Sequence, residues 1–420
     1  MFAGFTETFL KNGGQPLLYQ YTKKETNNPD NYRGISLSNT GYKIYSKIIA
    51  KRLTAIAKVL ILEEQNGFRK GRSCTDCIFS ASQIIEKHRE FNIPTYIAFI
   101  DLKKAFVSVD RDELWTIMLS KGIPNHLITI IQKTYTENII RVNAGNEISE
   151  DSRALTQGVR QGCSISPVLF NLYLDQVFGI WLQKLKTSKY FKELIFNTML
   201  FSDDQFIISD TEDNLQKTDY LLYNVSKIYN LEIATKKTKV FGFVGTDRLG
   251  TKIIVNDEIL QQVSLFNYLG CSISYQFSND VEFKLAKFLQ LIGTIKRTVF
   301  KKVRTATILK IYYTLVLPTF LYGSENWTLT VSQRQKIEAA EMKLLRPLAG
   351  YILYGHKTND YIRRELQITG ILDKIDEYRR NWLSHLQRMP QNRIPLKSYH
   401  YRPQGRRTIG RPKKRWREQL

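Results

Sequence analysis

The chain has 420 residues, 43% of them hydrophobic, so it can form two or three domains with packed cores and is not intrinsically disordered. It carries 62 Lys and Arg against 39 Asp and Glu, and the resulting charge of +23 indicates a polyanionic partner, with nucleic acid favoured over an anionic membrane surface. No apolar run is long enough to cross a membrane and no secretory signal peptide is recognisable, so we expect a soluble intracellular protein.

Predicted elements alternate between helices and strands through the first two thirds of the chain. Residues 38–60 carry Ile, Tyr and Leu at helical spacing with Lys and Arg on the opposite face, which predicts an amphipathic helix. Another helix is predicted over 78–91. The short apolar run that follows Pro94 and ends at Asp101 is typical of a buried strand.

The stretch SISPVLFNLYLDQVFGIWLQKL predicts a long buried helix, because Ser166 can cap its start, Pro167 suits the first helical position and the helix is apolar nearly all round. Two short strands follow within 197–209, then a helix from about Asn214 and a strand over 238–244. This order is typical of an α+β fold in which helices cover one face of an antiparallel sheet. The last third is mostly helical and ends in a basic segment.

Four cysteines are too few for a disulfide framework in a chain of this length. Cys74 and Cys77 form one CTDC pair, but no second pair follows at zinc spacing and the five histidines are scattered. We therefore predict structural thiols and no zinc site.

Two adjacent aspartates, Asp203 and Asp204, interrupt the apolar stretch MLFSDDQFIIS. A hairpin turn is one explanation, because this dipeptide is common in turns. The other begins from repulsion: two like charges in a partly dry site need a cation between them. Asp101, at the end of an earlier strand, could join the pair, and three such carboxylates would suit the Mg²⁺ ions that catalyse phosphoryl transfer in polymerases.

Ordered motifs along nearly the whole chain resemble those of the reverse transcriptases of non-LTR (LINE-type) retrotransposons. The fingers and palm motifs are, in order, NYRGISLSNTGYKIYSKIIAKRL (31–53), QNGFRKGRSCTDCIF (65–79), IAFIDLKKAFVSVDRDELW (97–115), QGVRQGCSISPVLFNLYLD (157–175), LFSDDQFII (200–208), LEIATKKTKVFGF (231–243) and FNYLGCSIS (266–274). The last of them resembles the hairpin that grips the primer. The region that these elements carry after the polymerase resembles LPTFLYGSENWTL (317–329), WLSHLQRMP (382–390) and GRRTIGRPKKRW (405–416). One motif alone could arise by chance, whereas seven in the same order could not.

The resemblance implies a right-handed polymerase with a catalytic centre that binds two Mg²⁺ ions, for which Mn²⁺ can substitute. Asp101, Asp203 and Asp204 match the metal-binding carboxylates, and Leu102 matches a position that contributes its backbone carbonyl. Lys237 matches the palm lysine that protonates pyrophosphate, although two neighbouring lysines compete for this assignment.

The nucleotide-binding residues are also implied by the resemblance. Arg69 matches the fingers arginine that neutralises the triphosphate, and Lys70 and Arg72 are either its helpers or simply solvated charges. Phe106 matches the aromatic residue that closes the sugar pocket and clashes with a ribose 2′-OH, a position in the core being the alternative for this ring. Gln161 and Gly162 match residues that pack near the nucleotide and the template.

Two positions depart from the family pattern. Val107 stands where an Asp is usual, and Ser202 where an Ala is usual. Position 107 is not a metal ligand, so we expect weakened and not abolished chemistry. No endonuclease and no Cys-His knuckle are recognisable, which is typical of the polymerase portion of a larger element or of a truncated copy.

The C-terminal segment is strongly basic, because residues 391–420 contain ten Lys or Arg and one Glu. Such a segment would bind a phosphate backbone with strong salt dependence. A solvated tail and a nuclear-localisation signal are the alternatives. The residues expected to bind nucleic acid are Arg406, Arg407, Arg411, Lys413, Lys414 and Arg415.

We therefore predict reverse transcriptase fingers and palm over residues 1–275, a helical thumb over 276–350 and a basic C-terminal extension over 351–420. The predicted function is RNA-directed DNA synthesis, with an RNA template, a DNA primer and dNTPs as partners, in the nucleus after synthesis in the cytoplasm. The alternatives are a catalytically decayed remnant that still binds nucleic acid, an RNA-templated RNA polymerase, and a group II intron-type maturase.

Overall fold

The structure is a computed structural model, which describes residues 17–22, 32–136, 139–144, 147–148, 153–154, 156–187, 198–276, 279–300, 302–352, 355–405, 407 and 415–419. Its packing divides the chain into two compact units. The first unit comprises Met1–Ser73, Tyr96–Val240 and Thr251–Gln262, and the second comprises Cys74–Thr95, Phe241–Gly250 and Val263–Leu420. Of the basic residues expected to bind nucleic acid, Arg406, Arg411, Lys413 and Lys414 lie outside the described residues.

An antiparallel sheet is the centre of the first unit. β3 (Thr95–Ile100) pairs with β8 (Asp204–Ser209), and β8 pairs with β7 (Thr198–Phe201). The strand predicted to end at Asp101 is confirmed as β3, whose side chains from Ile97 to Ile100 are all buried. Packing on both faces explains why its sequence is a continuous apolar run and not an alternating one.

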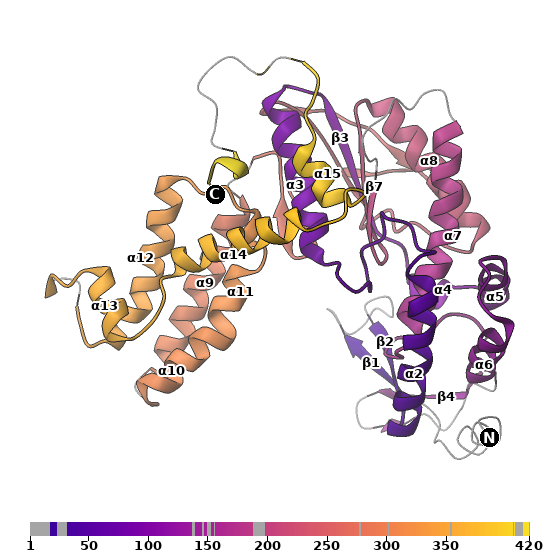
Figure 1. The fold of residues 1–420 in the computed structure, drawn as a ribbon, viewed down its shortest axis with the longest axis horizontal. Helices are drawn as coiled ribbons and strands as arrows, with labels where there is room; N and C mark the ends of the chain where they lie inside the picture. The colour runs from indigo at the N-terminus through magenta and orange to yellow at the C-terminus, as the bar shows by residue number, and fades with distance from the viewer. Residues whose placement is uncertain are drawn as a thin grey trace. The chain divides into compact units, whose positions relative to one another are not determined.

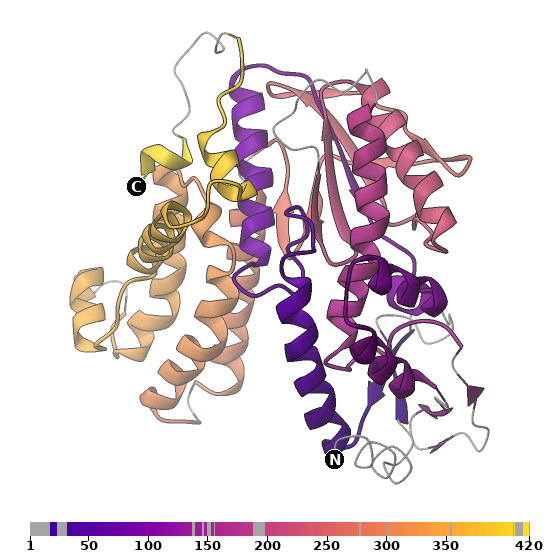
Figure 2. The same ribbon diagram turned by 45° about the vertical axis from the view of Figure 1, so that its right-hand side comes forward.

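The helices of the first unit are α2 (Thr40–Ala57), α4 (Ala105–Ser108), α5 (Arg111–Ser120), α6 (Asn125–Tyr135), α7 (Ser166–Thr187) and α8 (Glu212–Ile228). The long buried helix predicted from Ser166 is confirmed as α7, and its Trp181 is fully buried. α7 and α8 lie side by side against the sheet (Figures 1 and 2), where the Trp181 Nε1 donates to the Thr218 carbonyl over 3.1 Å. These contacts confirm the α+β fold class.

Further strands lie outside the β3–β8–β7 pairing. A further sheet contains β1 (Leu17–Thr22), β2 (Tyr32–Leu37), β4 (Ile139–Ala144), β5 (Glu147–Ile148) and β6 (Arg153–Ala154), with β1 antiparallel to β2 and parallel to β4. The strand predicted over 238–244 is confirmed as β9 (Lys239–Val244), which runs from the first unit into the second. It is followed by β10 (Asp247–Leu249), β11 (Ile254–Val255), β12 (Glu258–Ile259) and β13 (Gln261–Gln262).

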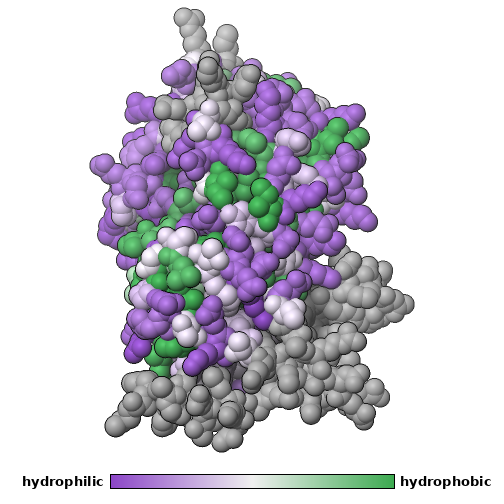
Figure 3. Space-filling model, turned by 90° about the vertical axis from the view of Figure 1, so that its right-hand side faces the viewer, coloured by the Kyte–Doolittle hydropathy of each residue, from purple (hydrophilic) through white to green (hydrophobic). Residues whose placement is uncertain are grey.

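The described surface gives no sign of a membrane segment. No helix in the described ranges combines the length and the hydrophobicity needed to cross a bilayer. The face drawn in Figure 3 is mainly hydrophilic, with hydrophobic residues in small separate groups. Scattered apolar residues of this kind are normal on a water-exposed surface.

The second unit is mostly helical. It contains α3 (Cys74–Glu90), α9 (Asn279–Thr298), α10 (Thr305–Ile311), α11 (Leu317–Leu321), α12 (Val331–Leu348), α13 (Asn359–Glu365), α14 (Ile371–Gln387) and α15 (Ile394–His400). Besides the antiparallel end of β9 with β10, it contains the hairpin of β14 (Phe266–Tyr268) and β15 (Cys271–Ile273). Its core includes Tyr312, Val316 and Phe320, so these residues of the aromatic stretch over 306–327 pack internally.

The C-terminal part of the chain folds back onto α3. α15 runs alongside α3 in both ribbon views (Figures 1 and 2). The Phe79 ring of α3 packs edge to face against Trp382, with ring centroids 5.4 Å apart, and against Trp416, with centroids 4.9 Å apart. Trp416 is fully buried although its sequence neighbours are basic. Where it is described, this segment is therefore part of a folded core.

Charged groups reinforce the same contact. Glu90 of α3 forms ion pairs with Arg407, at 2.9 Å, and with Arg415. Lys87 donates to the carbonyls of Ser398, over 2.6 Å, and Tyr399, over 2.8 Å. A helix that begins inside the polymerase motif at 65–79 thus packs with the C-terminal extension. The two units do not correspond one to one with the three expected domains, whose boundaries stay predictions.

We expect Trp416→Ala to destabilise the second unit, because it leaves a cavity beside Phe79 and removes two aromatic contacts. The expected loss in free energy of unfolding is about 3 kcal/mol. Urea denaturation followed by circular dichroism measures it. Tyr378→Ala is the matched control, because Tyr378 is an aromatic residue of α14 that is 40% exposed, and its loss should stay below about 1 kcal/mol. Equal losses in the two variants would contradict a buried Trp416.

Candidate active site

Strand register brings two of the predicted acidic residues together. In the β3–β8 pair Ile100 is opposite Gln205, and in the β7–β8 pair Phe201 is opposite Asp204. The β3–β8 pairing ends at Ile100, and continuing its antiparallel register by one residue would set Asp101 opposite Asp204. Side chains at such paired positions have Cβ atoms about 5 Å apart. Asp203 lies in the two-residue turn that joins β7 to β8, so all three aspartates lie at one end of the sheet.

The loop after α8 wraps around Asp101. The backbone N–H of Asp101 donates to the Thr238 hydroxyl over 3.3 Å, and the Asp101 carbonyl accepts the Ala234 N–H over 2.8 Å. These contacts carry Lys237 to the site, where its Nζ lies 3.2 Å from the Asp101 Oδ2. The lysine is 68% exposed, so this ion pair contributes little to stability. The sequence predicted both residues, and the structure brings them together.

The predicted cluster of three carboxylates is not a preformed metal cage. Within the described part of the chain, no group of three His, Cys, Asp or Glu side chains is arranged to hold a metal ion. The residues nevertheless fit an open Mg²⁺ site, because the buried Asp101 Oδ2 accepts no hydrogen bond and its ion-pair partner, Lys237, is an exposed lysine that a metal ion can replace. Mg²⁺ keeps several waters and is commonly bound by one or two carboxylates together with substrate phosphates. The roles of Asp101, Asp203 and Asp204 as metal ligands stay a prediction.

The turn between β7 and β8 is held from outside the hairpin. Ser202 has a left-handed backbone, with φ of 59°, which is uncommon for a residue other than glycine. The Gln65 side chain makes hydrogen bonds to both the N–H and the carbonyl of Ser202. Gln65 opens the motif at 65–79 and was not predicted as a site residue. Its place at the start of a fingers motif is the signal that the sequence offers for this residue.

Phe106 is packed as a fixed wall beside the acidic residues. In α4, its ring stacks on Phe170 of α7, with centroids 4.2 Å apart and planes at 25°, and it meets Phe68 edge to face. Its carbonyl accepts the Val159 N–H over 2.8 Å. A Cβ on Gly158 would lie 2.7 Å from the Val107 carbonyl oxygen, so this close approach requires glycine. Backbone contacts therefore lock two palm motifs together around the ring.

Val107, the departure from the family pattern, is 51% exposed. The missing carboxylate therefore leaves no buried hole or unpaired partner behind. The expected weakening of the chemistry stays a prediction.

The cations predicted to meet the triphosphate differ in how the structure uses them. The guanidinium of Arg69 donates to the carbonyls of Leu62, over 2.6 Å, Gln65, over 2.9 Å, and Lys58, over 3.3 Å. Arg69 thus braces the turn after α2, and it would have to give up these bonds to reach a phosphate. Lys70 is exposed to solvent. The nucleotide-binding roles of both residues stay predictions.

The other predicted nucleotide-binding positions form backbone contacts. Gln161 accepts the Ser36 N–H at its carbonyl over 2.8 Å, and Gly162 has φ of 105°. A Cβ on Gly162 would lie 2.9 Å from the Ser36 carbonyl oxygen, which again requires glycine. Leu102 is buried and forms an isolated bridge with Ile233. These residues hold loops against the sheet, and their contacts with a nucleotide stay predictions.

The comparison with protein families agrees with this geometry. Residues 22–273 match the family described as "Reverse transcriptase (RNA-dependent DNA polymerase)". The chain belongs to this family. The resemblance inferred from the motifs is confirmed, and the matched region ends in β15, inside the hairpin expected to be the primer grip.

Curated relatives of this reverse transcriptase chain come from transposable elements. It is 24% identical over 412 residues to the probable RNA-directed DNA polymerase from transposon X-element of Drosophila melanogaster, which covers 93% of this chain and 43% of the relative. It is 22% identical over 348 residues to a Pol polyprotein of type-1 retrotransposable element R2 from Popillia japonica, covering 78% of this chain and 46% of the relative. The chain thus spans less than half the length of these relatives.

Solved structures similar to the reverse transcriptase chain include telomerases. Telomerase from Candida albicans, determined with a TWJ fragment of telomeric RNA, aligns with a TM-score of 0.44 and 11% identity. The alignment covers 86% of this chain and 68% of the telomerase chain.

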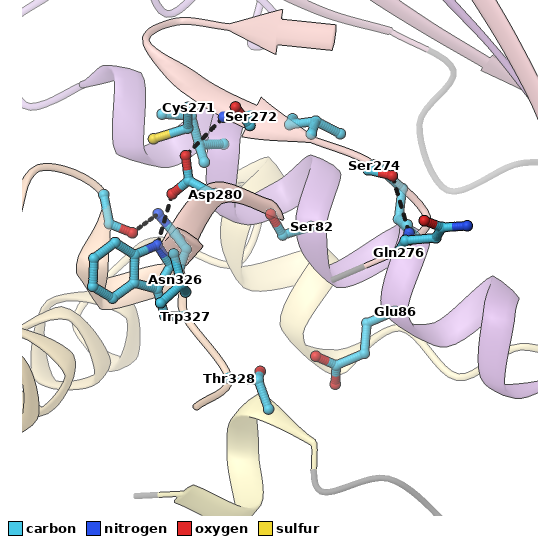
Figure 4. A pocket seen from close by; sticks show the side chains of 15 residues that line it. Ser82, Glu86, Cys271, Ser272, Ser274, Gln276, Asp280, Asn326, Trp327 and Thr328 are labelled. Atoms are coloured by element: carbon cyan, nitrogen blue, oxygen red, sulfur yellow. Dashed lines mark hydrogen bonds between the residues drawn. The ribbon is translucent and has the colours of Figure 1, made fainter. Parts of the chain in front are cut away.

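In the second unit of this reverse transcriptase, a cavity lies between α3, the β14–β15 hairpin and the start of α9 (Figure 4). Asp280 links the hairpin to the helices: it accepts the Ser272 N–H over 2.8 Å and the Trp327 Nε1–H over 2.7 Å, and pairs with Lys284 at 3.0 Å. The hairpin expected to grip the primer is therefore anchored to α9 by a buried charge network.

Glu86 faces the same cavity from α3 (Figure 4). Burial raises the pKa of its carboxyl to about 7, although the Trp416 N–H and the charge of Lys87 oppose the shift. The nearby Lys87 has a pKa lowered to about 8, also by burial. At a pH between the unfolded and the folded pKa, Glu86 is therefore protonated in the folded chain and ionised in the unfolded chain.

We expect Glu86→Gln to change how stability depends on pH. Because the folded pKa of Glu86 is raised above its unfolded value, its contribution is complete at low pH and is lost as pH rises through about 7. The variant lacks this loss, so its stability relative to the parent should grow between pH 5 and 7.5, by at most about 3 kcal/mol. Chemical denaturation at these pH values measures the difference, and staying below pH 8 limits titration of Lys87. A difference independent of pH would exclude the raised pKa.

Proposed function

We propose that this chain is an RNA-directed DNA polymerase that extends a primer 3′-OH with dNTPs on an RNA template. The observation that carries the proposal is the register that sets Asp101 against Asp204, with Asp203 in the adjoining turn. Membership of the reverse transcriptase family supports the reaction type, and the relatives named for RNA-directed DNA polymerase activity support the template and product.

Each acidic residue has a defined part in this proposal. Asp101, Asp203 and Asp204 would hold two Mg²⁺ ions, or Mn²⁺, whose chemistry is to activate the primer hydroxyl and stabilise the leaving pyrophosphate. Lys237 lies 3.2 Å from Asp101, and its exposed ammonium can reach a phosphate bound at the same end of the sheet. Its role would be to donate a proton to the pyrophosphate oxygen as the bond to the α-phosphate breaks.

Phe106 would select the sugar of the incoming nucleotide. Its stacking on Phe170 restricts movement of the ring, so the ring can act as a rigid wall against a 2′-OH. An RNA-templated RNA polymerase would need space or a polar partner at this position. The proposal therefore assigns dNTPs as substrates.

The charge of the chain supports nucleic acid as the partner. An excess of 23 positive charges would attract a phosphate backbone, and Arg407 and Arg415 add to it at the C-terminus. Both arginines form ion pairs with Glu90, which lowers the charge that they can offer. A protein that acts on chromosomal DNA would work in the nucleus after synthesis in the cytoplasm.

We expect Asp203→Asn combined with Asp204→Asn to abolish primer extension. The change removes two negative charges where metal ions would bind, and the rate should fall by roughly 1,000-fold, or about 4 kcal/mol of transition-state stabilisation. Extension of a DNA primer on an RNA template with dNTPs and Mg²⁺ measures the rate. Fluorescence anisotropy of the labelled primer-template checks that the variant still binds. A folded parent that binds but never extends the primer would instead support the inactive remnant.

We expect Phe106→Ala to weaken discrimination against ribonucleotides while DNA synthesis is partly retained. Removal of the ring opens space for a 2′-OH, so the ratio of kcat/KM for dNTP over rNTP should fall roughly tenfold or more. Single-nucleotide incorporation measures both values. Tyr220→Ala is the matched control, because Tyr220 is an aromatic residue of α8 that is 57% exposed. An unchanged ratio in Phe106→Ala would remove the assignment of Phe106.

A further inference from the structure

The turn that carries Asp203 contains backbone strain. Ser202 and Asp203 join β7 to β8, and the left-handed φ of Ser202 is unfavourable for a residue with a Cβ. The Ser202 hydroxyl is buried without a hydrogen-bond partner, so its side chain does not compensate for the strain. Such a conformation persists only where neighbouring groups hold it.

Gln65 supplies that restraint through both ends of its carboxamide. Its Oε1 accepts the Ser202 N–H over 2.9 Å, and its Nε2 donates to the Ser202 carbonyl over 3.2 Å. Bonds to both peptide groups of one residue restrict its φ and its ψ together. The Gln65 side chain is 2% exposed, so water does not compete for these bonds.

The backbone around Gln65 is itself fixed by hydrogen bonds. Leu200 donates its N–H to the Glu64 carbonyl over 2.9 Å and accepts the Asn66 N–H at its own carbonyl over 2.8 Å, so this segment pairs alongside β7. The Gly67 N–H donates to the Gln65 Oε1 over 2.8 Å, and the Gly67 carbonyl accepts the Asn171 Nδ2 over 2.8 Å. Contacts other than those with Ser202 therefore also fix the position of the Gln65 carboxamide.

Gly67 allows this approach because it lacks a side chain. A Cβ at this position would lie 2.2 Å from the Ser202 backbone nitrogen, which no rearrangement of a flexible side chain could relieve. The segment 64–67 is thus shaped to the backbone of the turn and not to its side chains. Asp203 follows Ser202 directly, so the direction of its peptide depends on the conformation that Gln65 holds.

We propose that Gln65 is a positioning residue for Asp203, acting through the backbone of Ser202. The proposal rests on the proposed function for its effect on metal dependence, but not for its effect on the turn. Groups that orient metal ligands typically change metal affinity or activity by 10–100-fold when they are lost. We call the two hydrogen bonds between the Gln65 side chain and the Ser202 backbone the clamp. Loss of the clamp should therefore weaken the response to Mg²⁺ more than it weakens folding.

The first test is Gln65→Met, which keeps the length and volume of the side chain and removes both bonds to Ser202. The matched control is Gln205→Met, because Gln205 is equally buried and lies in the hairpin that carries Ser202. Among the described residues, its side chain bonds only to the Thr198 hydroxyl. In Gln65→Met, we expect the Mg²⁺ concentration for half-maximal primer extension to rise about tenfold, against less than about twofold in the control.

Hydrogen exchange by mass spectrometry gives a readout that needs neither metal nor activity. Amides in peptides covering 198–209 should exchange faster in Gln65→Met than in the parent and the control. Adding Ser202→Gly to Gln65→Met should restore much of the Mg²⁺ response, because glycine adopts left-handed φ without strain. A merely structural role of Gln65 predicts no such rescue.

The outcomes separate the two proposals. An inactive parent combined with faster exchange in Gln65→Met alone would support the clamp and reject the proposed function. An active parent with an unchanged Mg²⁺ midpoint in Gln65→Met would overturn the positioning role. Unchanged exchange in the hairpin would overturn the clamp, whatever the activity.

Discussion

The pairing of β3 with β8 is the constraint on which the site depends. These strands are far apart in sequence, and their register alone sets Asp101 against Asp204. Side chains alternate along a strand, so a shift by one residue would turn every side chain of one strand to the other face of the sheet. Buried Phe99 and Phe206, which pack edge to face across the two strands, make that shift costly. The apolar core of the sheet therefore determines the position of the charged residues at its end.

The contacts around the site mainly restrain the backbone of its loops. The acidic side chains themselves form few strong interactions. Gly158 and Gly162 allow the loop before α7 to approach Val107 and Ser36, and Gln65 holds Ser202 by both of its peptide groups. The acidic residues remain partly exposed, and the described residues form no preformed cluster for a metal. An arrangement of this kind suits ions that arrive with substrate phosphates, because a rigid cage of three carboxylates would be repulsive when empty.

The second unit shows how one basic segment can have two physical roles. Trp416 is buried against Phe79, while Arg415 and Arg407 form ion pairs with Glu90. Burial of Trp416 attaches the segment to α3, and Glu90 of α3 neutralises part of the positive charge of the segment. Composition alone describes such a stretch as a solvated tail, because it averages over a tryptophan whose partner lies more than 300 positions away.

Local patterns in the chain were enough to predict the family, the buried strand before Asp101, the long helix α7 and the acidic pair at a hairpin, because periodicity and motifs reside in neighbouring residues. The partners of individual side chains depended on folding. The donors of Arg69 are used on three carbonyls, Gln65 reaches across 137 positions to Ser202, and α3 packs with the C-terminal segment instead of with its sequence neighbours. These contacts arise from strand register and helix packing between distant segments, which no window along the sequence contains.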